Sequence, residues 1–245
     1  ADAAQPMPKS DSLWTASSMV LSPGSPVTLI WENGNGLTFR RQLSINNDYM
    51  ITVDDSVESA LTAPLTLFPY GLVRRHGTPA TTGIYILHEG ALGVFDETLR
   101  EEDYDDMRDA DGGVSEIRPE MPGGWIGFTD KYWLAALLPD QSANMNFAFK
   151  SLAGPSDRYQ VDYIASEASV LPAGGVVSSQ TRLFAGAKKV SLLDGYADEI
   201  GIANFDLAID FGWFYFLTKP FFLVINWLNG ILGNFGVAVL GLSLI

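Results

Sequence analysis

A histidine beside a carboxylate and a run of acidic residues are the two groups in this sequence whose types could carry out chemistry. His88 and Glu89 could transfer protons at a sugar, but neighbouring side chains on a strand point to opposite faces of a sheet. The acidic side chains between Glu101 and Asp111 could bind calcium, yet they lack the alternate spacing and the bidentate glutamate of a calcium loop. We therefore interpret this run as a solvated hairpin tip, and we expect no enzyme active site, no metal site and no cofactor.

The composition excludes further classes of site. With no cysteine, the chain has no disulfide framework, no thiol nucleophile and no thiolate zinc site. The 245 residues carry 29 acidic and 15 basic side chains, and the net charge of -14 argues against nucleic acid as a partner. It argues equally against anionic lipid as the main partner of the soluble part. The 26 residues from Pro220 to Ile245, by contrast, carry no charged side chain.

Short strand-like segments dominate the first three quarters of the chain. Residues 1–26 are rich in Pro, Ser and Ala, and we expect an irregular lead-in with a strand near Ser18–Leu21. Asn33–Gly36 is a strong hairpin signal, because asparagine and glycine tolerate the positive φ of primed turns. The repeated short strand-like segments of residues 27–186 therefore predict a mainly β fold, an antiparallel sandwich. The expected strands are Val27–Glu32, Leu37–Ile45, Tyr49–Val57, Leu65–Val73, Gly83–His88, Gly90–Phe95, Trp125–Thr129, Tyr132–Leu138, Asn146–Lys150, Tyr159–Ile164 and Val176–Phe184.

After residue 186 the sequence pattern changes from one typical of strands to one typical of helices. Residues 187–219 have apolar positions at helical spacing and predict a helical linker to a membrane. In residues 220–233 the few non-apolar positions recur every three or four residues, which gathers them on one face of an amphipathic helix that lies in the membrane interface. Residues 234–245 would form the first half of a transmembrane helix, roughly 16 Å long. The alternative is one straight spanning helix from Pro220 to Ile245; Gly230, Gly233 and Asn234 favour a bend.

Two sets of residues would carry the contact with the membrane. The first set is apolar or aromatic and is expected at the interface: Trp213, Phe214, Phe221, Leu223, Ile225, Trp227 and Leu228. The second set would open the helix or bend the chain: Pro220, Gly233, Asn234 and Gly236. Docking of the aromatic residues around Trp213 against the sandwich remains an alternative. Trp125, Tyr132 and Trp133 are expected in core and hairpin packing, with sugar stacking as the alternative.

Several motifs between Val27 and Ile245 resemble, in order, the YidC family of bacterial membrane protein insertases. They are Gly123–Trp133 with Leu138–Pro139, Leu183–Lys188, Leu192–Tyr196, Phe205–Tyr215, Lys219–Pro220 and Gly233–Gly236. The resemblance implies a periplasmic β-supersandwich, an amphipathic helix on the outer face of the inner membrane, and an activity that inserts and folds membrane proteins, alone or with the Sec translocon. It implies membrane lipid, nascent membrane proteins and Sec subunits as partners.

The resemblance also implies that the chain is a segment of a longer protein. The family's first membrane helix and the arginine of its membrane groove fall outside these residues, so no residue here is assigned that role. Two alternatives remain open. One is a membrane-tethered carbohydrate-binding supersandwich, and the other is a structural module that insertion does not need.

Overall fold

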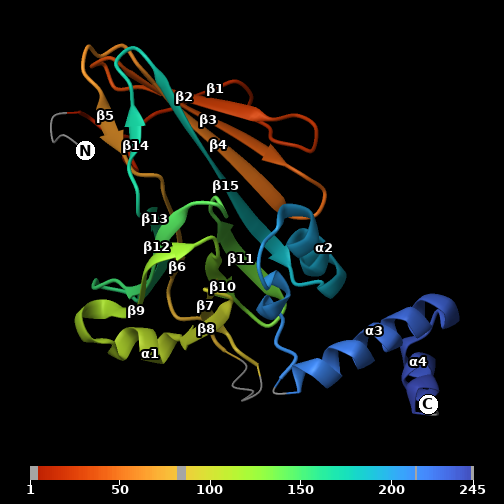
Figure 1. Ribbon diagram of the computed structural model, residues 1–245. Coiled ribbons are helices and arrows are strands. Elements are labelled where there is room, and N and C mark those ends of the chain that lie inside the picture. Colours follow the sequence, from red (N-terminus) through yellow and green to blue (C-terminus); the bar gives the residue numbers. More distant parts are fainter. Residues whose placement is uncertain (1–4, 82–86, 213, 244–245) are drawn as a thin grey trace. The chain divides into compact units, whose positions relative to one another are not determined.

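The computed structural model describes residues 5–81, 87–212 and 214–243 and is mainly β (Figure 1). The described chain forms two compact units. The first, which we call the β body, comprises Ala1–Thr82 and His88–Ala208 and contains all the strands of the described residues. The second contains the helices that follow residue 209. The predicted mainly β class and antiparallel pairing are confirmed, and each unit is described below by itself.

Three antiparallel sheets build the described part of the β body. The largest has nine strands, in the order β1 (Thr15–Ala16), β2 (Val27–Glu32), β3 (Leu37–Ile45), β4 (Met50–Ser59), β15 (Val176–Ala187), β11 (Trp133–Leu138), β10 (Trp125–Thr129), β7 (Gly90–Phe95) and β8 (Thr98–Asp103). The second has four strands, in the order β6 (Tyr70–His76), β13 (Arg158–Ala165), β12 (Asn144–Ser151) and β9 (Val114–Pro122). The third pairs β14 (Ser169–Leu171) with β5 (Leu65–Leu67).

Asparagine side chains fix the turns that set the register of the long strands. In the hairpin between β2 and β3, Asn33 Oδ1 accepts hydrogen bonds from the backbone N–H groups of Asn35 and Leu37 at 2.7 and 2.9 Å. Gly36 adopts a φ of 89° there, which a side chain with a Cβ would strain. Asn46 repeats the arrangement before β4, accepting from Asp48 and Met50. The hairpin that the Asn-Gly pattern predicted is therefore present.

The main core lies between the nine-stranded and the four-stranded sheets. Alternate residues of each strand face inward, as the period of two in a strand requires. Phe95 of β7 contacts Phe147 of β12 with ring centroids 4.8 Å apart. On β13, Tyr159, Val161 and Tyr163 join this core. Packing of one apolar face on another makes this part of the chain a sandwich.

The opposite face of the nine-stranded sheet is covered by α2 (Val190–Ile200) and the 3₁₀ turn η2 (Phe205–Ala208). Phe205 makes edge-on contacts with Trp125 and Phe184, at centroid distances of 5.3 and 5.7 Å. The Trp125 Nε1–H donates to the carbonyl of Ala203 at 3.3 Å, so the buried indole nitrogen is satisfied. Gly201 ends α2 in the left-handed region, as the sequence predicted.

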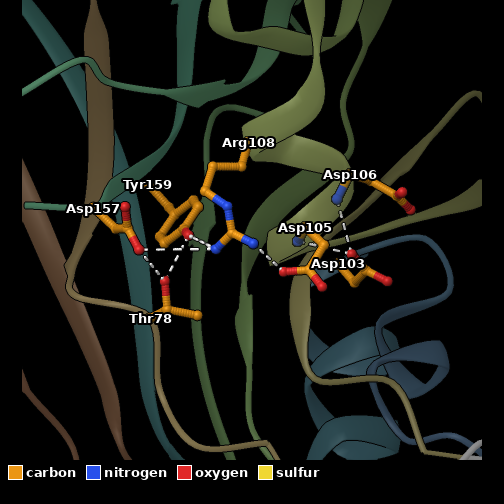
Figure 2. Close-up of polar contacts among 7 residues, drawn as sticks. All are labelled: Thr78, Asp103, Asp105, Asp106, Arg108, Asp157 and Tyr159. Atoms are coloured by element: carbon orange, nitrogen blue, oxygen red, sulfur yellow. Dashed lines mark hydrogen bonds and ion pairs between the residues drawn. The ribbon is translucent and has the colours of Figure 1, made fainter.

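The acidic run is not a hairpin tip, so that prediction was wrong. Its residues form β8, the short helix α1 (Tyr104–Asp109) and the 3₁₀ turn η1 (Asp111–Gly113). Asp103 caps α1 by accepting from the N–H groups of Asp105 and Asp106, both at 2.9 Å (Figure 2). Tyr104 and Met107, three residues apart, are buried on one face of the helix. Burial of two apolar residues at helical spacing thus stabilises this helix. In the sequence, the many carboxylates around them made the helical spacing hard to recognise.

One further strand prediction differs from the structure, and another is not tested by it. The lead-in strand is β1, which pairs with β2 through Thr15 and Ala16, whereas Met19 and Val20 lie exposed in the following loop. The β1 pairing is anchored by the Ser17 side chain, whose hydroxyl accepts from the Thr28 N–H at 2.9 Å. The strand expected at Gly83–His88 falls mostly on residues 82–86, which lie outside the described residues.

Candidate functional site

The second unit presents apolar side chains on the surface of a helix. In α3 (Tyr215–Leu232) and the residue before it, Phe214, Phe221, Leu223 and Trp227 are all exposed, Trp227 by 64%. Ile225 and Leu228 are half-buried. Trp213 lies outside the described residues. An exposed apolar surface of this kind on a helix is typical of a contact with another molecule or with lipid.

Polar groups follow a narrow line along α3. Lys219, Asn226 and Gly230 are separated by seven and four residues, so they lie on the same face of an 18-residue helix. No charged side chain follows Lys219 in the sequence. The helix is therefore amphipathic, but its polar face is only a thin stripe and the rest of its surface is apolar.

Pro220 does not open the helix, contrary to the sequence prediction. α3 begins at Tyr215, and Pro220 is its sixth residue. The first turn forms without it, because the N–H groups of Leu217 and Thr218 both donate to the Phe214 carbonyl at 2.8 Å. Proline lacks the N–H that would bond to the carbonyl four residues earlier, so it weakens the ladder at this point. Phe211 packs edge-on against Phe222 at 6.0 Å and holds the same turn.

The chain bends sharply at Gly233 and Asn234. Gly233 takes the left-handed conformation, with a φ of 66°, and its N–H donates to the Asn229 carbonyl at 2.8 Å. Asn234 then caps α4 (Phe235–Leu242), its side chain accepting from the Val237 N–H at 3.2 Å. A glycine stop followed by an asparagine cap separates two helices, so the straight helix from Pro220 to Ile245 is not what the structure contains.

α4 packs back against α3 through small residues. Ala238 is fully buried. A Cβ placed on Gly241 would lie 3.6 Å from the Leu228 Cδ1 atom, and one on Gly236 would lie 3.3 Å from the Asn234 Oδ1 atom. Among the described residues, none of the helices combines the length and the apolar character needed to cross a membrane. The predicted first half of a transmembrane helix is therefore not confirmed.

The histidine–carboxylate pair serves the local structure. The His88 Nε2 atom lies 2.9 Å from the Ala91 carbonyl, and the Glu89 carboxylate accepts from the Lys131 N–H at 3.3 Å. Of the three residues named for core and hairpin packing, with sugar stacking as the alternative, Trp125 is completely buried, whereas Tyr132 and Trp133 are exposed. The described residues contain no group of three or more metal-binding side chains close enough to hold an ion. None of these groups forms a recognisable site for catalysis.

A polar network that sequence reasoning missed joins α1 to the ends of β6 and β13 (Figure 2). The Arg108 guanidinium donates to the Tyr159 hydroxyl at 3.2 Å and lies 3.8 Å from the Asp157 carboxylate. Thr78 bonds both Asp157 and Tyr159, at 2.6 and 2.7 Å. The hydrogen-bonded partners are separated by 51 to 81 positions in sequence, so no local pattern could have indicated them. The Tyr159 ring of this network packs against the Tyr104 ring, with centroids 4.7 Å apart.

Tyr104 makes the stability of the fold sensitive to alkaline pH. Burial raises the pKa of Tyr104 to about 12. A tyrosine in the unfolded chain ionises near pH 10, so between pH 10 and 12 only the unfolded state releases this proton. The unfolding free energy should fall by up to about 3 kcal/mol across that interval, and Tyr104→Phe should make the decline shallower in urea titrations.

The same variant should be close to neutral at pH 7, because the Tyr104 hydroxyl has no hydrogen-bond partner among the described residues. Equal slopes for the two proteins between pH 10 and 12 would show that Tyr104 ionises normally in the fold.

Comparisons with known proteins identify the family. A family model described as the YidC periplasmic domain matches residues 1–224. Proteins named membrane protein insertase YidC from Beijerinckia indica, Methylobacterium nodulans and Methylobacterium sp. strain 4-46 are 43%, 45% and 46% identical to this chain. The chain belongs to the YidC family. The alignments cover 100%, 99% and 99% of the chain, and the resemblance carried by the sequence motifs is confirmed.

The chain spans about two fifths of these YidC relatives, 40%, 41% and 40% of their lengths. The matched periplasmic-domain model ends at residue 224, inside α3, so the β body lies within it and α4 lies beyond it. Among solved structures, a putative aldose 1-epimerase from Escherichia coli K12 has a TM-score of 0.46 and 9% identity, covering 71% of this chain and 68% of that chain. This likeness is too weak to bear on activity.

Proposed function

We propose that this chain is the periplasmic scaffold and membrane-approach segment of an inner-membrane insertase that inserts and folds membrane proteins. The observation that carries the proposal is the pair α3–α4, in which Lys219 is the single charged residue and most of the apolar side chains are exposed. Each leucine or phenylalanine side chain that leaves water gains about 1.5–3 kcal/mol when fully buried. A lipid interface can take up this surface without a protein partner.

In this arrangement α3 lies flat in the outer interface of the membrane. Its 18 residues span about 27 Å, and Trp227, in the second half of the helix, prefers the depth of the lipid headgroups. The polar stripe of Lys219, Asn226 and Gly230 faces water. The bend at Gly233 and Asn234 then turns the chain, so that α4 starts the descent into the hydrocarbon region as the first part of a membrane helix. Its eight residues cover about 12 Å of a core about 30 Å thick.

The partners follow from this placement. Membrane lipid contacts α3 and α4, and the β body stands in the periplasm as a supersandwich scaffold. Nascent membrane proteins are the clients, and subunits of the Sec translocon are a further candidate partner of the β body. The net charge of -14 supports the absence of nucleic acid from this set. The chain contributes no catalytic residue to the activity.

The absence of cysteine from the sequence permits a direct test with a single label. An environment-sensitive fluorophore on Ile231→Cys, a position 63% exposed in α3, should shift to the blue on binding vesicles and be quenched by brominated lipid. Ser178→Cys, on an exposed position of β15, is the matched control and should stay in water. A label at position 231 that remains in water with lipid in excess would reject the interfacial placement.

A further inference from the structure

A cluster of tyrosine, tryptophan and lysine side chains lies at one end of the nine-stranded sheet. It comprises Tyr49, Lys131, Tyr132, Trp133, Lys188 and Lys189, and we call it the aromatic–lysine patch. The Trp133–Ala187 pairing of β11 with β15, and a 2.9 Å hydrogen bond from the Lys188 N–H to the Tyr132 carbonyl, bring its members together from distant parts of the chain.

Two of the three aromatic rings of the patch are strongly exposed, while Tyr49 is half-buried. Tyr132 is 64% exposed and Trp133 is 58% exposed, whereas Trp125 in the adjacent strand is completely buried. The Lys131 ammonium lies 5.1 Å from the ring centroid of Tyr132, and the Lys189 ammonium lies 5.7 Å from that of Tyr49. Exposed aromatic rings with lysines beside them are typical of a surface that contacts another molecule.

The charge of the patch runs against that of the chain. The sequence has six lysines and a net charge of -14, and three of the six lysines are in the patch. Around it, Asp130 forms an ion pair with Arg75 at 2.8 Å, the Glu89 carboxylate accepts from the Lys131 N–H, and the Lys188 ammonium donates to the Thr129 hydroxyl at 2.7 Å. The patch therefore gathers half of the lysines of an acidic chain, and Lys131 and Lys189 lie beside its aromatic rings.

We propose that the aromatic–lysine patch seats the β body on the anionic lipid surface of the membrane. Tryptophan and tyrosine prefer the headgroup region, and each lysine near an anionic surface strengthens binding about fivefold. The inference rests on the proposed function, since it needs a membrane close to the β body, and it adds a second contact that is separate from α3. The net charge of the chain predicts that anionic lipid is not the main partner of the soluble part. A contact limited to the aromatic–lysine patch is compatible with this prediction.

A label within the patch tests this contact. The fluorophore is attached to Tyr132→Cys in the otherwise cysteine-free chain, and vesicles of phosphatidylglycerol are compared with vesicles of phosphatidylcholine. The label should be quenched by brominated lipid in the anionic vesicles, and the quenching should be lost in phosphatidylcholine or at high salt. In the same protein, Lys131→Glu and Lys189→Glu should each weaken the immersion of the label by at least about fivefold. Lys9→Glu makes the same charge change at an exposed position outside the patch and should have no effect.

The outcomes separate the two proposals. If the label at position 132 stays in water while the label at position 231 is immersed, the patch proposal is wrong and the interfacial placement of α3 stands. Should both labels stay in water, the proposed function fails as well. Immersion at position 132 that is equal in both lipids and unchanged by Lys131→Glu would overturn the role of the lysines. Thermal unfolding of each variant verifies that the fold is intact.

Discussion

Replacing both Leu223 and Trp227 by aspartate should release the chain from vesicles and stop insertion by a full-length insertase that carries it. Both side chains are exposed and one helical turn apart, so the substitutions leave the β body untouched. A charge at each position should cost about 2 kcal/mol of membrane binding, less than at the centre of a bilayer. Together they should weaken partitioning by roughly a thousandfold, since each 1.4 kcal/mol is about tenfold.

The matched control is Asn226→Asp, which adds one carboxylate to the polar stripe of the same helix. Asn226 is exposed and already polar, so vesicle binding and insertion should change little. Co-sedimentation with vesicles measures the binding, and the yield of a membrane-protein substrate in a depletion strain measures the insertion. Normal insertion by the double aspartate variant at normal abundance would contradict the proposed role of α3.

Most of the strands were predictable from sequence because local rules decide them, although β9 and β14 were not predicted and the expected strand Leu65–Val73 is divided between β5 and β6. Alternation of apolar and polar residues sets which side chains face the core, and Asn33 and Asn46 fix the adjoining turns through their own side chains. The α1 helix was missed because Tyr104 and Met107 supply only two apolar positions within an acidic run. Its capping residue, Asp103, was read as one more solvated charge, although it binds two backbone N–H groups.

The second unit shows what sequence leaves undetermined. The glycine at 233 and the asparagine at 234 predicted a bend, and the residues on either side form separate helices. The start of α3 was misjudged, since Pro220 is a preferred first residue but is also tolerated within a helix whose other bonds hold. Exposure could not be predicted either. The same apolar composition would suit a buried helix, and only the structure leaves Phe221 and Trp227 uncovered.

Trp125→Ala should be the most destabilising single substitution considered for the β body, by about 3–5 kcal/mol. The indole is completely buried, packs edge-on against Phe205 and donates to the Ala203 carbonyl. Its removal opens a cavity under η2 and leaves that carbonyl without its donor. For a domain of about 200 residues, 1 kcal/mol corresponds to about 2–4 °C, so the melting temperature should fall by roughly 10 °C.

Trp133→Ala is the control that separates burial from residue type. Trp133 is in the next strand and is 58% exposed, so its loss should change the unfolding free energy by about 0.5 kcal/mol or less. The comparison also bears on the carbohydrate-binding alternative, in which Trp125 would be a surface platform and its loss would leave stability intact. Calorimetry of the two variants compares their melting temperatures. Equal melting temperatures would mean that η2 does not depend on Trp125. A large difference assigns Trp125 to the core and leaves Trp133 free to contact a membrane.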